Sequence, residues 1–270
     1  MSFLGDGLLI LVVVYAVILL SLYLMQRRLI FPASADRPDL QQTNGADQFQ
    51  AVTIKLPDGT ELISWYAPAH RNDGRTIIYF HGNAGNIGGR VERVLPYLDA
   101  GYGILLVGYP GYGGNPGLCS EQSFYATARA NLDFLSQQGV DAARVILFGE
   151  SLGTAVAIQM GVERPALALI LEAPLASTYL SAWARYPYMA FGRLIRDKFA
   201  SIDKIDRVRM PLLVIHGEND LTTAIRFGRA VFDRANEPKT GFFPAQAGHN
   251  DLMQHGMPET VLKFLAALPA

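Results

Sequence analysis

The chain has 270 residues, half of them apolar, which suits one large domain with a substantial core and a short appendage. Its 23 basic residues nearly balance 24 acidic ones and form no run longer than two, so nucleic acid is not expected as a partner. A single cysteine, Cys119, excludes an intramolecular disulfide, and the five histidines show no zinc-binding spacing. We therefore expect neither a metal nor another cofactor.

The first predicted element is a long apolar helix near the N-terminus. Residues 8–25 carry no charge, and a helix of that length spans about 27 Å, close to the thickness of a bilayer's hydrocarbon core. The segment is apolar on every face, which disfavours a core helix of the domain. We predict an uncleaved transmembrane anchor at residues 1–30 that contacts membrane lipid.

The flanks of this segment bear on its processing and its orientation. Ala33-Ser34-Ala35 resembles a signal-peptidase site, but residues 1–7 carry Asp6 and no lysine or arginine, which is atypical of a secretory signal. Arg27 and Arg28 lie on the carboxyl side of the apolar run. By the positive-inside rule we expect a single-pass membrane protein whose main domain, C-terminal to this segment, faces the cytoplasm.

A polar connection and a hairpin come next. Residues 31–48 contain two prolines and the pair Asn44-Gly45, which predicts a linker from the membrane to a domain at 49–270. Residues 52–56 and 61–66 flank Pro57-Asp58-Gly59 and predict a β-hairpin at the antiparallel edge of a sheet.

Further apolar runs predict buried strands, each separated from the next by a helix-length segment. These runs are residues 76–80, 103–107, 145–148, 167–171, 212–215 and 240–243. Strands that alternate with helices predict an α/β fold, with a mostly parallel eight-stranded sheet and helices on both faces. In such a fold the functional loops gather at the carboxyl ends of the strands.

The most specific motif is Gly149-Glu150-Ser151-Leu152-Gly153, which fits G-x-S-x-G between a predicted strand and a predicted helix. A serine on such a sharp turn has its hydroxyl lifted clear of the sheet, and the glycines remove side chains that would collide there. Ser151 is therefore the predicted nucleophile. An ordinary glycine-rich turn between strand and helix is the alternative.

Two main-chain amides are candidates for stabilising an oxyanion at this serine. The Leu152 amide opens the helix after Ser151, and the Asn83 amide lies in the glycine-rich loop after the strand at 76–80. A glycine-rich loop is also typical of phosphate binding. However, the chain contains neither G-x-x-x-x-G-K-[ST] nor G-x-G-x-x-G, so a nucleotide site is not expected.

A serine nucleophile needs a histidine base, and in an α/β-hydrolase arrangement the base comes last along the chain. Of the histidines after Ser151, His216 ends an apolar run and would have no suitably placed acid before it. His249 lies in a loop between the last predicted strand and a C-terminal helix, and His255 follows at the start of that helix. His249 is the predicted base.

The acid that orients this base should follow the penultimate strand. Asp220 ends the loop after the strand at 212–215 and is the predicted acid, although an aspartate there could also cap the next helix. Glu218 in the same loop is one alternative. Glu172, just past the strand at 167–171, is another, because some hydrolases place the acid there.

A segment at 174–205 interrupts the alternation of strands and helices and is a predicted lid. Tyr179, Trp183 and Tyr186 fall at helical spacing and form one aromatic face, and basic residues outnumber acidic ones around it. One interpretation is a helix packed on the core with a solvated basic face. The other is an amphipathic lid over an acyl pocket that also touches anionic lipid.

These motifs together resemble the α/β-hydrolase superfamily and, more narrowly, its membrane-anchored branch of bud-emergence-suppressor-like serine hydrolases, which includes protein depalmitoylases. The resemblance runs from about Val52 to the C-terminus. It rests on His81-Gly82-Asn83-Ala84-Gly85-Asn86, Gly108-Tyr109-Pro110-Gly111-Tyr112-Gly113, Gly149 to Gly153, Gly217 to Asp220, and Gly248-His249-Asn250-Asp251.

The resemblance implies a nucleophile, acid and base at Ser151, Asp220 and His249, with oxyanion donors at Asn83 and Leu152. The chain departs from the branch at two places. Members often carry Asp-Tyr-Arg-Gly-Tyr-Gly where Gly108 and Pro110 stand here, and a Val-Pro pair after the acid where Leu221-Thr222 stands.

Taken together, the sequence predicts a membrane-anchored serine hydrolase that cleaves an acyl ester or thioester and uses no cofactor. Acylated proteins or lipid-like esters are the expected substrates because the chain is predicted to be attached to a membrane. A serine peptidase on the same fold is the enzymatic alternative. A membrane-tethered binding protein that has kept a hydrolase fold is the alternative from another class.

Overall fold

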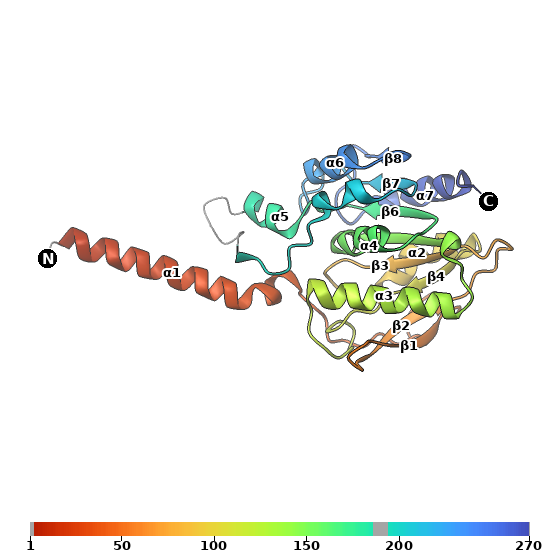
Figure 1. Ribbon diagram of the computed structural model, residues 1–270, viewed down its shortest axis with the longest axis horizontal. Coiled ribbons are helices and arrows are strands. Elements are labelled where there is room, and N and C mark those ends of the chain that lie inside the picture. The colour runs from red at the N-terminus through yellow and green to blue at the C-terminus, as the bar shows by residue number, and fades with distance from the viewer. Residues whose placement is uncertain (1–2, 186–193, 270) are drawn as a thin grey trace.

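The computed structural model describes residues 3–185 and 194–269, and the chain forms one α/β domain with a long helix projecting from it (Figure 1). The strands are β1 Gln50–Lys55, β2 Glu61–Ala67, β3 Thr76–Phe80, β4 Gly103–Leu106, β5 Val145–Glu150, β6 Ala168–Glu172, β7 Leu212–Ile215 and β8 Lys239–Phe242. The helices are α1 Phe3–Ile30, α2 Val91–Asp99, α3 Glu121–Gln137, α4 Leu152–Glu163, α5 Thr178–Arg185, α6 Ile225–Arg234 and α7 Met257–Ala266.

The eight strands form one sheet in the order β1-β2-β4-β3-β5-β6-β7-β8. The predicted hairpin is present as the antiparallel pair β1–β2 at the edge, and β2 also pairs antiparallel with β4. Every pair from β4 through β3 to β8 is parallel. The carboxyl ends of these parallel strands therefore share one edge of the sheet, here called the carboxyl edge.

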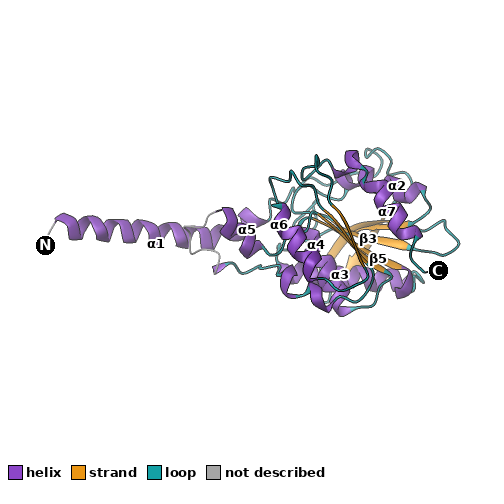
Figure 2. Cartoon of the chain, turned by 90° about the horizontal axis from the view of Figure 1, so that it is seen from above, coloured by secondary structure: helices purple, strands orange, loops and turns teal. Residues whose placement is uncertain are grey.

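Both faces of the sheet are buried, which explains why the central strands are continuous apolar runs. In β3, Ile78 and Phe80 enter a core with side chains from α3, α4 and α6, whereas Ile77 and Tyr79 enter a core with side chains from α2 and α7. Figure 2 shows the sheet between these two helical layers. The alternation follows from the two-residue period of a strand.

Helix α1 extends away from the domain and is long and apolar enough to cross a membrane over Asp6–Ile30 (Figure 1). Its 28 residues make it about 42 Å long. The large apolar side chains that it presents from Leu8 onward are mostly exposed, so the domain does not use them as core. This exposure and length suit a bilayer rather than a soluble core.

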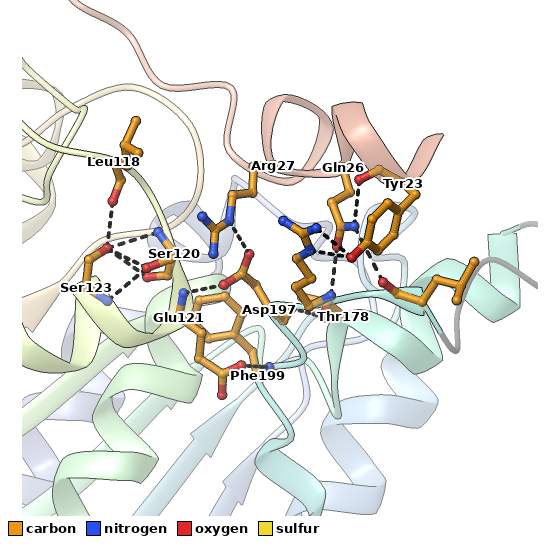
Figure 3. Close-up of polar contacts among 12 residues, drawn as sticks. Tyr23, Gln26, Arg27, Leu118, Ser120, Glu121, Ser123, Thr178, Asp197 and Phe199 are labelled. Carbon is orange, nitrogen blue, oxygen red and sulfur yellow. Dashed lines mark hydrogen bonds and ion pairs between the residues drawn. The ribbon is translucent and has the colours of Figure 1, made fainter. Parts of the chain in front are cut away.

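The carboxyl end of α1 is attached to the domain by specific contacts (Figure 3). Arg27 forms an ion pair of 2.9 Å with Asp197, whose carboxylate also accepts from the first amide of α3 at 2.8 Å. The Gln26 side chain accepts from the Arg196 amide at 2.7 Å. Phe31, only 4% exposed, packs against the rings of Phe124 and Phe199. The helix is therefore docked at its base.

The predicted lid is described only in part. Helix α5 lies beside the base of α1 at the same end of the domain in both views (Figures 1 and 2). Tyr179 is half-buried on this helix and Trp183 is 45% exposed. Tyr186, the third predicted aromatic residue, lies outside the described residues.

Candidate active site

Ser151 occupies a strained turn between β5 and α4. Its φ of 50° and ψ of −114° are unusual for a residue with a side chain, and the Ser151 amide is held by the Glu172 carbonyl at 2.8 Å. A Cβ at Gly153 would lie 1.9 Å from the Phe80 carbonyl oxygen, and one at Gly149 would lie 2.5 Å from the Thr154 Cα. The two glycines of the motif are thus required by close backbone packing.

Three predicted side chains meet at this turn, although they lie on three different loops. The Ser151 hydroxyl is 3.1 Å from His249 Nε2, and His249 Nδ1 is 2.6 Å from Asp220 Oδ2. Both distances are in the hydrogen-bond range. Because Asp220 accepts from Nδ1–H, Nε2 is left as an acceptor for the serine hydroxyl. The result is a continuous chain from hydroxyl to imidazole to carboxylate.

Asp220 is buried and fully hydrogen-bonded. Its Oδ1 accepts from the amides of Thr222 and Thr223 at 2.8 and 2.7 Å, and its Oδ2 accepts from His249 Nδ1. This Oδ2 also lies 3.1 Å from His216 Nε2, which is 2.9 Å from the Thr223 carbonyl as well. Burial alone would raise the pKa of Asp220, but the hydrogen bonds from His216 and His249 outweigh it and hold the pKa well below its ordinary value. The carboxylate is therefore ionised at neutral pH.

The two candidate oxyanion amides lie on segments next to the serine: Leu152 follows Ser151, and a Cβ on Gly82, the residue before Asn83, would lie 3.4 Å from the Ser151 Cβ. In the described part of the chain, neither the Asn83 nor the Leu152 main-chain N–H has a hydrogen-bond acceptor. Leu152 is the first residue of α4, where the helix offers such an amide no internal partner. Asn83 is held by other atoms: its carbonyl accepts from the Tyr112 hydroxyl at 2.9 Å, and its side chain donates to the Ile30 carbonyl at 3.1 Å.

A second buried polar network lies at the carboxyl ends of β5 and β6. Arg90 makes two bonds to the Glu150 carboxylate, at 2.8 and 3.0 Å, and Arg93 pairs with the Glu172 carboxylate. Burial would raise the pKa of Glu150, but Arg90 lowers it to about 2. Burial raises the pKa of Glu172 to about 7, against the opposing effect of Arg93. We name these four side chains the arginine–glutamate network.

The structure also locates the alternative bases and acids. Glu172 makes its ion pair with Arg93, and Glu218 pairs with Arg229 at the surface. His255 Nε2 lies 3.7 Å from Asp251. In the described residues, the carboxylate that contacts His249 is that of Asp220.

Sequence reasoning did not identify His216 as a partner of the predicted acid, nor Tyr112 as a support for the Asn83 loop. His216 is four residues before Asp220 and directly follows β7, so the turn after the strand brings the two side chains together. That spacing was a usable signal. The hydroxyl of Tyr112 reaches the Asn83 carbonyl across 29 residues, a contact that the local sequence does not indicate.

Known proteins with similar sequences are found although no family model matches the chain. An uncharacterized protein of Mycobacterium tuberculosis is 37% identical over 237 residues, which cover 87% of this chain and 84% of the relative. The alpha/beta hydrolase domain-containing protein 17B of Xenopus laevis is 30% identical over 230 residues, 82% of this chain and 77% of the relative. The chain belongs to the α/β-hydrolase superfamily. The predicted resemblance is confirmed, and the relationship supports hydrolase activity.

Solved structures confirm the α/β-hydrolase fold. An esterase from Pyrococcus furiosus matches with a TM-score of 0.71 at 17% identity, covering 89% of this chain and 98% of that structure. An alpha-beta hydrolase from Vibrio vulnificus matches with a TM-score of 0.68 at 20% identity, covering 81% of each chain. At these identities the likeness concerns the fold alone.

Proposed function

We propose that this α/β-hydrolase is a membrane-anchored serine hydrolase that cleaves carboxylic esters or thioesters through an acyl-enzyme. The observation that carries the proposal is the unbroken hydrogen-bond chain from Ser151 through His249 to Asp220, with distances of 3.1 and 2.6 Å. A hydroxyl is a weak nucleophile unless a base takes its proton, and a base in this position supplies that step.

In the proposed reaction, His249 Nε2 takes the Ser151 proton while Oγ attacks the acyl carbonyl. The Asn83 and Leu152 amides then hold the resulting oxyanion. Collapse breaks the bond to the alcohol or thiol, which leaves with the proton from His249. Water, activated by the same imidazole, attacks the acyl-enzyme and releases the carboxylic acid with Ser151 restored.

Asp220 has two tasks in this reaction. It fixes the His249 tautomer that leaves Nε2 free to accept, and its negative charge stabilises the imidazolium that forms after proton transfer. The lowered pKa of Asp220 supports both tasks, because the carboxylate stays ionised while the imidazole gains and loses its proton.

The proposed substrates are acylated proteins or lipid-like esters, and the proposed location is a membrane. Helix α1 supports the location by its length, composition and exposure. Relatives that are named alpha/beta hydrolase domain-containing protein 17B fit the proposed depalmitoylase-like branch. Arg27 and Arg28 at the domain end of α1 favour a cytoplasmic domain by the positive-inside rule. This orientation can be tested by adding protease to sealed inverted vesicles, whose cytoplasmic side faces outward. If the orientation is right, the protease should cleave the domain.

The decisive experiment is fluorophosphonate labelling of the full chain in detergent. Wild type should be labelled, and Ser151→Ala and His249→Ala should not. Ser136→Ala and His255→Ala are matched controls: Ser136 is exposed on α3, and His255 lies outside the chain of hydrogen bonds. Both should label normally. A folded wild-type protein that takes no label would contradict the proposal and favour the membrane-tethered binding protein.

Turnover of p-nitrophenyl esters of increasing acyl length, beside a thioester and an anilide, would define the substrate class. We expect long acyl esters and thioesters to be cleaved fastest. Faster cleavage of the anilide would instead favour the serine peptidase alternative.

A further inference from the structure

The base of α1 contacts the loop that carries a proposed oxyanion donor. Ile30 is the last residue of α1, and its carbonyl is among those that a helix leaves without an internal partner. The Asn83 side chain donates to this carbonyl at 3.1 Å. A residue of the candidate active site thus caps the apolar helix across 53 positions of sequence.

The segment that follows α1 makes further contacts with the same edge of the sheet. Ala33 forms a parallel bridge with Gly85, and the Asp36 carbonyl accepts from the Asn86 side chain at 3.0 Å. The Ser34 carbonyl accepts from the Gly113 amide at 2.8 Å, on the loop that carries Tyr112. Residues 30–36 therefore run along the Asn83 loop as a brace, a name used below for this segment.

Asn83 is fixed from two sides. On one side its side chain is bound to the brace at Ile30, and on the other its carbonyl accepts from the Tyr112 hydroxyl. Tyr112 is itself 1% exposed and contacts the Phe124 ring. These two contacts fix the side chain of Asn83 and the peptide group that follows it. The Asn83 N–H belongs to the preceding peptide group, whose Gly82 carbonyl lies 2.7 Å from His81 Nδ1, and this N–H has no acceptor in the described part of the chain.

The brace is anchored to the domain at its α1 end. Phe31 is buried between aromatic rings, and Arg27 is paired with Asp197, of which the side chain is 4% exposed (Figure 3). Ile30 lies between these two anchored residues, so it cannot shift unless the contacts of Phe31 or Arg27 break.

We propose that the Asn83 side chain is a positioning residue: by capping α1 at Ile30 it orients its own main-chain amide toward the oxyanion, so that the membrane helix forms part of the catalytic apparatus. This inference rests on the proposed serine-hydrolase function. An oxyanion donor acts only when it is aimed at the developing charge, and loss of one such donor typically lowers kcat by about 10²–10³-fold. A donor that is still present but poorly aimed should lower kcat by less than the loss of the donor does.

The test compares Asn83→Ala with wild type in the full chain. This variant keeps the main-chain amide and removes only the cap. We expect kcat for a p-nitrophenyl ester to fall by about tenfold with KM nearly unchanged, because an oxyanion contact acts in the transition state and not on bound substrate. The inhibition constant of an alkyl boronic acid, which forms a tetrahedral adduct on the serine, should rise in parallel.

Asn236→Ala is the matched control. Asn236 also donates its side-chain amide to main-chain carbonyls, those of Asp206 and Val208, before the amino ends of β7 and β8 and so at the opposite edge of the sheet from Ser151. It should lose stability without losing kcat or boronic acid affinity. This comparison separates a loss of positioning from a general loss of stability.

Equal kcat and equal boronic acid affinity in Asn83→Ala and wild type would overturn the inference while leaving the serine-hydrolase proposal intact. The proposal itself is tested separately by Ser151→Ala, which must be inactive. If Asn83→Ala does not fold, Asn83→Asp keeps the size of the side chain but cannot donate to Ile30, and the same changes in kcat and inhibition are expected of it.

Discussion

Two buried polar networks lie side by side at the carboxyl edge of the sheet, and they differ in the type of basic side chain that faces the carboxylate. Asp220 is bound by two histidines, whereas Glu150 and Glu172 are bound by Arg90 and Arg93. An imidazole gains and loses a proton near neutral pH, but a guanidinium stays protonated. The imidazole of the first network can therefore take and release the Ser151 proton, whereas the guanidinium groups of the second network keep their charge.

The networks also differ in what they reach. The His249 side chain is 14% exposed and ends on the Ser151 hydroxyl, while the Glu172 side chain is 1% exposed and ends on Arg93. The same sheet edge thus carries one carboxylate that contacts His249 and two, Glu150 and Glu172, that end the strands beside the Ser151 turn. Substitutions in the first network should therefore lower activity, whereas substitutions in the second should lower stability.

The largest expected effect is that of Asp220→Asn. It should lower kcat by roughly 10³–10⁴-fold with the fold retained, because an amide does not fix the required His249 tautomer or stabilise its cation. Glu172→Gln is the counterpart in the other network and should change kcat little. Ester hydrolysis and circular dichroism of both variants would measure this. An equal loss of kcat in Glu172→Gln would show that the arginine–glutamate network takes part in the chemistry.

Arg90→Met should act on stability instead. It leaves the Glu150 carboxylate, with a side chain 14% exposed, without its bidentate partner, and we expect a loss of about 3 kcal/mol in the free energy of unfolding. Arg229→Met breaks a surface ion pair with Glu218 and should cost less than about 1 kcal/mol. Urea unfolding in detergent, followed by tryptophan fluorescence, would compare them. Similar losses in the free energy of unfolding would mean that the buried Arg90–Glu150 pair stabilises the fold no more than a surface ion pair does.

Acid should destabilise wild type more than Glu150→Gln. The fold lowers the pKa of Glu150 from 4.5 to about 2, so this carboxylate contributes stability that is fully present above pH 4.5 and is lost as the pH falls toward 2. Between pH 5 and pH 3 we expect wild type to lose about 2 kcal/mol more than the variant. Unfolding curves at stepped pH would show it, and parallel curves for the two proteins would contradict it.

The smallest expected effect is that of His216→Leu. It removes one of the donors to Asp220 and should lower kcat by about tenfold with little change in KM, since a hydrogen bond to a charged group contributes about 1.5–3 kcal/mol. Steady-state kinetics on the same ester would measure it. An unchanged kcat would mean that His249 and the Thr222 and Thr223 amides suffice to hold the carboxylate.

Much of the fold was predictable because its signals are local. The central strands are continuous apolar runs, and the hairpin, the β5–α4 turn and the long apolar helix each carry their own residue pattern. The order of serine, acid and histidine along the chain sufficed to choose the three side chains that the structure brings together. Their catalytic roles remain predictions.

The rest depends on contacts between distant segments. Glu150 meets Arg90 across 60 positions, and Asn83 meets Ile30 across 53. Neither arginine nor asparagine carries a local pattern that indicates its partner, because each is an ordinary polar residue until the sheet assembles. Residues 31–48 illustrate the same point: their composition is that of a linker, but Phe31 and Ala46 are buried against the domain.

That packing has a consequence for where the enzyme can act. A free chain as long as residues 31–48 would let the domain wander over about 25 Å. Here the chain lies along the domain, and α1 ends at the loop of Asn83. If α1 spans a bilayer as proposed, these contacts would hold Ser151 at a fixed height above the lipid. The proposed hydrolase would then reach acyl groups whose scissile bond lies at that height.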